Sequence, residues 1–119
     1  NTITLPDLAQ GEIYAGIMIN SDGAPSHHLI LLPGDNDDAN WADQTEWAKS
    51  IGGELPTRAE QSLLFANLKD QVEVRWHWTS EEFDSSYAWI QDFNYGYQND
   101  GVKSYGGLAR AVRLIQLTA

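Results

Sequence analysis

The first third of the chain has the hydrophobic pattern of a β hairpin. Residues 12–19 are rich in β-branched and aromatic side chains, and the turn-forming residues 21–25 separate them from the apolar stretch 27–32. The four residues 29–32 are apolar in succession, which favours a strand that is covered on both faces. We therefore predict two antiparallel strands over 12–19 and 27–32.

A helical pattern follows, and it occurs twice. Apolar side chains recur at helical spacing between Asn40, a favourable N-cap, and the glycine pair at 52–53. Thr57 and Glu60 have the spacing of a capping box, in which each side chain accepts a hydrogen bond from the other residue's backbone. We predict helices over about 40–51 and 57–68, with an acidic loop at 35–38 ahead of the first.

From Trp76 onward the pattern changes to short β segments. We expect strands at 76–80, 87–94, 102–105 and 109–117, because turn-forming residues at 85–86, 99–101 and 106–107 interrupt them. Two strands, two helices and then a run of strands predict an α+β fold with two helices packed on antiparallel strands. A length of 119 residues predicts a single domain over 1–119.

Charge and composition narrow the range of partners. The chain has 7 basic and 17 acidic residues and a net charge of −10, so we expect no nucleic acid partner. Its apolar runs are far shorter than the roughly 20 residues of a membrane span, so we expect no membrane insertion. The absence of cysteine excludes disulfides, thiolate metal sites and cysteine nucleophiles.

Candidate chemistry is sparse. The sequence contains none of the common nucleophile, nucleotide-binding or zinc-protease motifs. His27 and His28 are adjacent strand residues, which point to opposite faces and do not readily share a metal ion. The acidic loop 35–38 has oxygen ligands of the kind that calcium takes, and a solvated loop before a helix explains it equally well. The acids within 81–84 fit either a glycoside hydrolase or solvated loop residues. We expect no enzyme and no cofactor, with calcium left open.

Aromatic residues gather in the second half of the chain. Nine of the 13 lie between residues 76 and 105. Tryptophans in helices and strands are usually buried, so we assign four of them to the core. These four are Trp41, Trp47, Trp78 and Trp89.

The tyrosines of the same stretch have a different setting. Tyr95, Tyr97 and Tyr105 lie among asparagine, glycine and serine, a mixture typical of antibody paratopes. The alternative is an ordinary polar hairpin with amphipathic tyrosines at its rim. The residues we expect to bind a ligand are His77, Glu82, Phe83, Tyr95, Tyr97, Asn99, Asp100, Lys103 and Tyr105.

The order of several short motifs gives the chain a family resemblance. The motifs are Trp47-Ala48, residues 53–60 (Gly-Glu-Leu-Pro-Thr-Arg-Ala-Glu), Trp78-Thr79-Ser80, Ala88-Trp89, Asp92-Phe93, Gly96 and residues 110–113 (Arg-Ala-Val-Arg). In this order, over about residues 12–115, they resemble the C-type-lectin-like domain family of bacterial collagen-like adhesin C-terminal domains and phage or prophage proteins. That family is related in fold to formylglycine-generating enzymes and to retroelement-diversified receptor-binding proteins of phages.

The resemblance implies a C-type-lectin-like fold, with fixed helices and a long-range sheet and with later loops that vary and bind. The chemistry of the enzyme branch is not implied, because formylglycine-generating enzymes depend on cysteines and this chain has none. The Glu-Pro-Asn and Trp-Asn-Asp triplets of calcium-dependent lectins are also absent from the sequence.

The function that the resemblance implies is a non-catalytic recognition module of phage or prophage origin. We expect it to bind a glycan or a cell-surface protein through residues 76–105, on a virion or outside the cell rather than in the cytoplasm. The alternative is a structural virion component, a homo-oligomer whose exposed aromatic residues make permanent subunit contacts.

Overall fold

The computed structural model describes residues 4–117. Its first half contains β1 (Ile13–Ile19), β2 (Pro25–Leu31), β3 (Asn36–Ala39), α1 (Trp41–Ser50), α2 (Arg58–Leu68) and a short 3-10 helix, η1 (Lys69–Gln71). Its second half contains β4 (Trp76–Glu82), β5 (Tyr87–Asp92), β6 (Gln98–Val102), β7 (Gly107–Ala109) and β8 (Val112–Gln116). The architecture is therefore α+β, as the sequence predicts.

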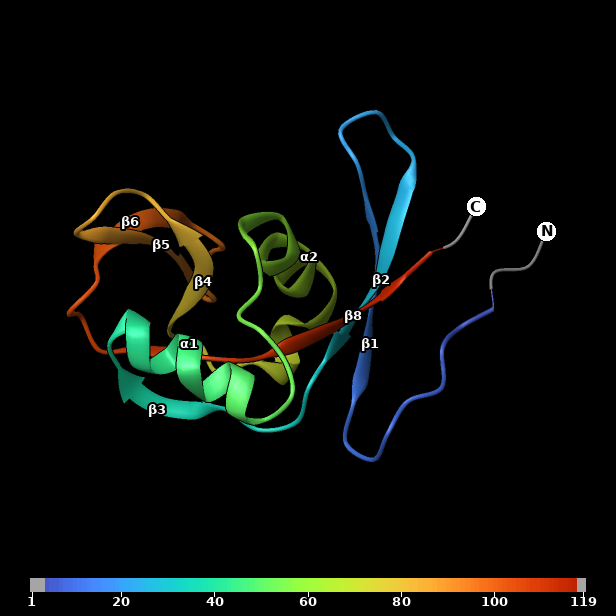
Figure 1. Ribbon diagram of the computed structural model, residues 1–119, viewed down its shortest axis with the longest axis horizontal. Coiled ribbons are helices and arrows are strands. Elements are labelled where there is room, and N and C mark those ends of the chain that lie inside the picture. The colour runs from blue at the N-terminus through green and yellow to red at the C-terminus, as the bar shows by residue number, and fades with distance from the viewer. Residues whose placement is uncertain (1–3, 118–119) are drawn as a thin grey trace.

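The strands form two sheets. One is antiparallel with the order β1-β2-β8, and the other has the order β3-β7-β4-β5-β6. The second sheet is mixed, because β4 and β7 pair in parallel through His77 and Leu108. The two sheets lie at opposite ends of the molecule with α2 between them, and the described chain begins and ends beside the three-stranded sheet (Figure 1).

Local sequence signals fix both helix starts. The Asn40 side chain accepts a hydrogen bond from the Asp43 amide at 2.8 Å, and Thr57 and Glu60 make both bonds of the capping box. After α1 the chain turns at Gly52, where φ is 87°, a value that glycine adopts without steric cost. The predicted helices and their caps are confirmed.

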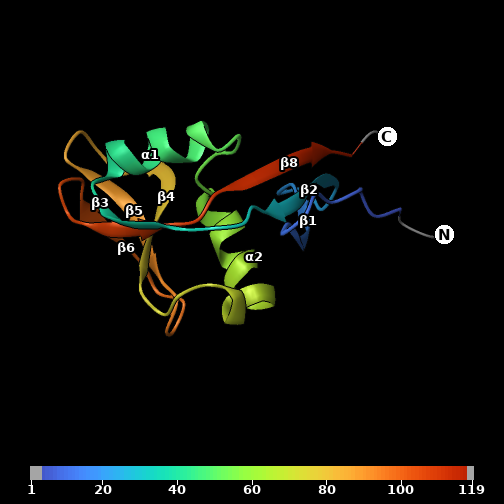
Figure 2. The same ribbon diagram turned by 90° about the horizontal axis from the view of Figure 1, so that it is seen from below.

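The two helices contact opposite faces of the five-stranded sheet, α1 the face that carries Trp78 and α2 the face that carries Gln91. Figure 2 shows α1 above the strands and α2 between this sheet and the three-stranded one. On the α1 side, Trp78 is completely buried in a cluster with Leu32, Ala48, Leu55 and Ile90. A second cluster, which includes Leu29, Leu31, Leu64 and Phe93, joins α2 to the three-stranded sheet.

Three predictions of secondary structure are wrong. The expected acidic loop contains β3, because its backbone pairs with β7. The expected turn at 99–101 lies within β6, so the strand falls at Gln98–Val102 instead of 102–105. The expected strand 109–117 is divided between β7 and β8, which belong to different sheets. Long-range pairing decided all three, and local turn residues do not report it.

The tryptophan assignments are correct in part. Trp78 is buried, whereas Trp41, Trp47 and Trp89 are only partly buried, the first two where they pack against its cluster. Across residues 4–117, no helix is both long and apolar enough to cross a membrane. The single domain expected over 1–119 stays a prediction.

Candidate functional site

The face of the five-stranded sheet toward α1 is apolar and is only partly covered by the helix. Trp78 packs there, and its indole Nε1 donates a hydrogen bond to the Ala39 carbonyl at 3.1 Å. Two glycines make room for this ring, since a Cβ on Gly107 would lie 2.8 Å from Trp78 Nε1 and one on Gly101 would lie 3.4 Å from the ring. The part of the face beyond Trp78 is open to solvent.

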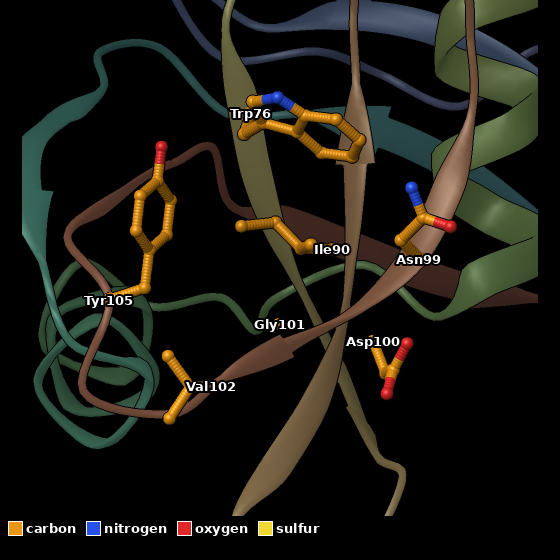
Figure 3. Close-up of a pocket in the computed structure, with 7 residues that line it drawn as sticks. All are labelled: Trp76, Ile90, Asn99, Asp100, Gly101, Val102 and Tyr105. Atoms are coloured by element: carbon orange, nitrogen blue, oxygen red, sulfur yellow. The ribbon is translucent and has the colours of Figure 1, made fainter.

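A shallow pocket of about 350 Å³ occupies this open part. In Figure 3 the rings of Trp76 and Tyr105 stand on either side of Ile90, and Gly101 and Val102 of β6 lie beside them. Tyr105 is 46% exposed and packs edge-on against Trp78, with ring centroids 6.4 Å apart. The pocket is lined by Trp76, Ile90, Asn99, Asp100, Gly101, Val102 and Tyr105. We call it the Trp76–Tyr105 pocket.

Polar groups from β6 lie along one side of the pocket. Asn99 and Asp100 are both exposed. Asn99 pairs with Ile90 and shares its face, whereas Asp100 pairs with Trp89, so its side chain lies on the opposite face of the sheet. Neither side chain takes part in the hydrogen bonds found among residues 4–117, nor does the Tyr105 hydroxyl. An apolar hollow with a few convergent polar groups is the usual form of a small-molecule or side-chain binding site.

Tyr95 and Tyr97 lie in the connection between β5 and β6, at the same end of the sheet as Trp76. Their rings are 6.0 Å apart, and the side chains are 71% and 65% exposed. Asp92 holds the connection in place, because its carboxylate accepts hydrogen bonds from the amides of Asn94 and Tyr95. The pair is thus a rigid, exposed aromatic surface.

Glu82, Phe83 and Lys103 form a separate group at the opposite end of β4–β6. Lys103 Nζ lies 2.6 Å from the Glu82 carboxylate and 4.8 Å from the Trp41 ring centroid. Phe83 is exposed and packs edge-on against Trp89. The candidate residues therefore do not form one continuous cluster.

His77 lies apart from all of them. Its side chain is completely buried, stacks edge-on against Phe93, and makes a 2.9 Å hydrogen bond from Nδ1 to the Arg75 carbonyl. Burial lowers its pKa from 6.5 to about 4, because the protonated ring would lose its hydration there. His77 is consequently not part of any exposed surface.

The pocket contains four residues that the sequence analysis did not select: Trp76, Ile90, Gly101 and Val102. Trp76 carried a usable signal, because it alternates with the core residue Trp78 at the start of a strand. Gly101 carried the opposite signal, since its position after Asn99 and Asp100 predicts a turn.

Several of the acidic residues considered for chemistry have partners within the fold. Glu81 accepts a hydrogen bond from the Arg58 amide, and Asp84 accepts bonds from the amides of Ser86 and Tyr87. In the segment 35–38, which the sequence predicted to be an acidic loop, the Asp38 carboxylate lies 2.7 Å from the Arg75 guanidinium.

The histidines and acids of the described residues do not share a metal site. His27 and His28 bind different partners, Glu60 and Tyr14. Within the described part of the chain, no three histidine or acidic side chains converge as a metal site would need.

No protein-family model matches the chain, and no curated protein matches it in sequence.

Proposed function

We propose that this protein is a non-catalytic recognition module that binds a glycan or a cell-surface protein. The binding surface consists of the Trp76–Tyr105 pocket and the neighbouring pair Tyr95 and Tyr97. The observation that carries the proposal is the pocket itself, in which two aromatic rings and unpartnered polar groups face solvent.

The rigidity of this surface also supports binding. The pocket rests on paired strands, and the Tyr95–Tyr97 connection is fixed by the Asp92 carboxylate. Tyrosine offers a large contact area with little rotamer entropy to lose, so a fixed aromatic surface binds at small entropic cost. Exposed aromatic residues contribute little to stability, and a binding role explains why they are there.

We also propose a C-type-lectin-like fold of phage or prophage origin. In support of the fold, two helices follow the first hairpin, and the last strand, β8, returns to pair with β2. This pairing matches the long-range sheet that the motif resemblance implies. The phage or prophage origin, and with it a place on a virion or outside the cell, rests on the motif resemblance alone.

The test is binding of labelled protein to intact bacterial cells and to a glycan array, each in calcium and in chelator. We expect binding that is insensitive to chelator. The double variant Tyr95→Ala/Tyr97→Ala and the single variant Tyr105→Ala should each lose binding. Ile19→Ala is the matched control, because Ile19 is 62% exposed on β1, in the other sheet.

The outcomes separate the alternatives. Loss of signal in chelator would replace direct aromatic binding with calcium-dependent binding. No signal on any surface, together with a stable oligomer in light scattering, would favour the structural virion component. A large fall in melting temperature in the double tyrosine variant would make these residues part of the fold and would overturn their assignment.

A further inference from the structure

We propose that the Trp76–Tyr105 pocket receives the guanidinium group of an arginine on a partner protein. This inference rests on the proposed function, since it names the chemistry of the ligand that the same surface binds. It selects the protein partner over the glycan.

The chain places three of its own cations over aromatic rings. The Arg58 guanidinium lies 3.6 Å from the centroid of Trp89, Lys103 Nζ lies 4.8 Å from that of Trp41, and Lys69 Nζ lies 5.6 Å from that of Phe65. Cations are attracted to the negative faces of such rings. Among residues 4–117, no cation of the chain lies over Trp76 or Tyr105, so their faces are free for one supplied from outside.

Most basic side chains of the protein already have hydrogen-bond partners within the chain. Five of its seven basic side chains are already hydrogen-bonded to acidic, amide or carbonyl groups: Arg58, Arg75, Lys103, Arg110 and Arg113. The net charge of −10, which already counts these cations, attracts a basic partner.

The geometry of the pocket also suits a guanidinium group. The two aromatic rings and Ile90 offer flat, apolar contacts that suit the weakly hydrated face of a guanidinium group. The Asn99 side chain lies on the same face as Ile90, and its amide oxygen can accept a hydrogen bond from the edge of the guanidinium group. Arg58, which contacts the Trp89 ring and donates to Gln98 at 2.9 Å, makes the same combination within the chain.

The test is titration of the full chain with N-acetyl-arginine amide, followed by NMR. The readouts are the Trp76 indole resonance, assigned with Trp76→Phe, and the backbone amide resonances of β6. N-acetyl-citrulline amide is the matched control, because it keeps the shape of arginine without the charge. We expect roughly millimolar affinity for the arginine probe and at least about fivefold weaker binding of citrulline.

Variants locate the interaction. Asn99→Leu keeps the approximate size of the side chain but removes the acceptor, and it should weaken arginine binding about fivefold. Glu46→Gln removes an exposed charge on α1, outside the pocket lining, and should leave the affinity unchanged. A loss in the Glu46 variant as large as that in the Asn99 variant would show that the effect is not local to the pocket and would overturn the site.

The remaining measurements decide which ligand the pocket binds. Equal binding of arginine and citrulline, or binding of choline or methyl glucoside without binding of arginine, would overturn the inference. Cell binding that arginine amide cannot compete would do the same and would leave the proposed function standing. If arginine binds the pocket but the protein binds no cell and no glycan, the pocket assignment stands and the proposed function fails.

Discussion

The two faces of the five-stranded sheet differ in the kind of interaction that buries them. Toward α1, Trp78, Ala88 and Ile90 form an apolar layer. Toward α2, the buried side chains that the strands contribute are polar, namely His77, Thr79 and Gln91, and Gln61 of the helix lies against them.

The polar face is satisfied mainly by bonds from side chains to the backbone. Gln61 Nε2 donates to the carbonyl of Trp78 at 3.2 Å, and Gln91 Nε2 donates to the carbonyl of Gln61 at 2.9 Å. Gln98, on β6, donates to the Gln91 side chain at 2.6 Å. Burial on this face depends on directional bonds, whereas burial on the other depends on fitting a large ring.

The difference between the two faces of the sheet determines where a binding surface is available. The buried polar side chains on the α2 side lie beneath the helix, where a ligand does not reach them, although Gln61 Oε1 and His77 Nε2 have no hydrogen-bond partner within residues 4–117. On the α1 side the helix covers Trp78 and leaves Trp76, Ile90 and Tyr105 at a pocket. The surface proposed for binding is thus the uncovered edge of a hydrophobic core.

The largest effect is expected on the apolar face. Trp78→Ala removes a completely buried indole and should lower the free energy of unfolding by about 3–5 kcal/mol. Urea denaturation measures this change, and Trp78→Phe should lose less because a ring still fills part of the space. A loss below about 1 kcal/mol for the alanine variant would mean that this face is loosely packed.

The polar face should respond to pH through His77. Its pKa is about 4 in the folded protein against 6.5 ordinarily, because the ring is buried. Between pH 6.5 and 4 the unfolded chain therefore binds a proton that the folded protein excludes. Stability is complete above pH 6.5 and should fall by up to about 3 kcal/mol as the pH approaches 4.

Denaturation at pH 7 and pH 4 tests this, with His77→Gln as the variant that should flatten the profile. Glu12 affects stability over a lower range of pH, because its hydrogen bonds with Arg113 lower its pKa from 4.5 to about 2. Its contribution is present above pH 4.5 and is lost as the pH falls toward 2. An unchanged slope in the histidine variant would assign the pH dependence to other groups.

A smaller effect is expected from the glutamines. Gln91→Leu keeps the approximate volume but removes the bonds to the Gln61 carbonyl and the Gln98 amide, so we expect a loss of about 1–3 kcal/mol. Chemical denaturation at pH 7 measures it. A variant as stable as the natural chain would show that an apolar layer serves equally well on both faces.

The smallest effect on stability is expected at the exposed edge. Tyr95→Ala/Tyr97→Ala should change the free energy of unfolding by no more than about 0.5 kcal/mol per site, because both rings are mostly exposed. A calorimetric melting curve measures this. Stability should be retained while cell binding is lost, which separates the two roles of aromatic residues in this protein.

Local signals predicted those parts of the fold that neighbouring residues control. The capping box of Thr57 and Glu60, the Asn40 cap and the first hairpin are all found where the sequence places them. Each depends on contacts within a few residues or across one turn. Tyr95, Tyr97, Asn99, Asp100 and Tyr105 were likewise selected from local composition, and the structure places all five on the surface.

Tertiary structure decided the remainder. The sequence cannot reveal that Gly101 lies in a strand over the Trp78 ring, because this depends on the pairing of β6 with β5. The alternation of Trp76, His77 and Trp78 predicts one buried face, but α2 covers the polar side as well and buries His77. Short-range sequence specifies caps, turns and side-chain chemistry. The packing of distant segments specifies which side chains are left to meet a partner, since burial depends on residues far away in the chain.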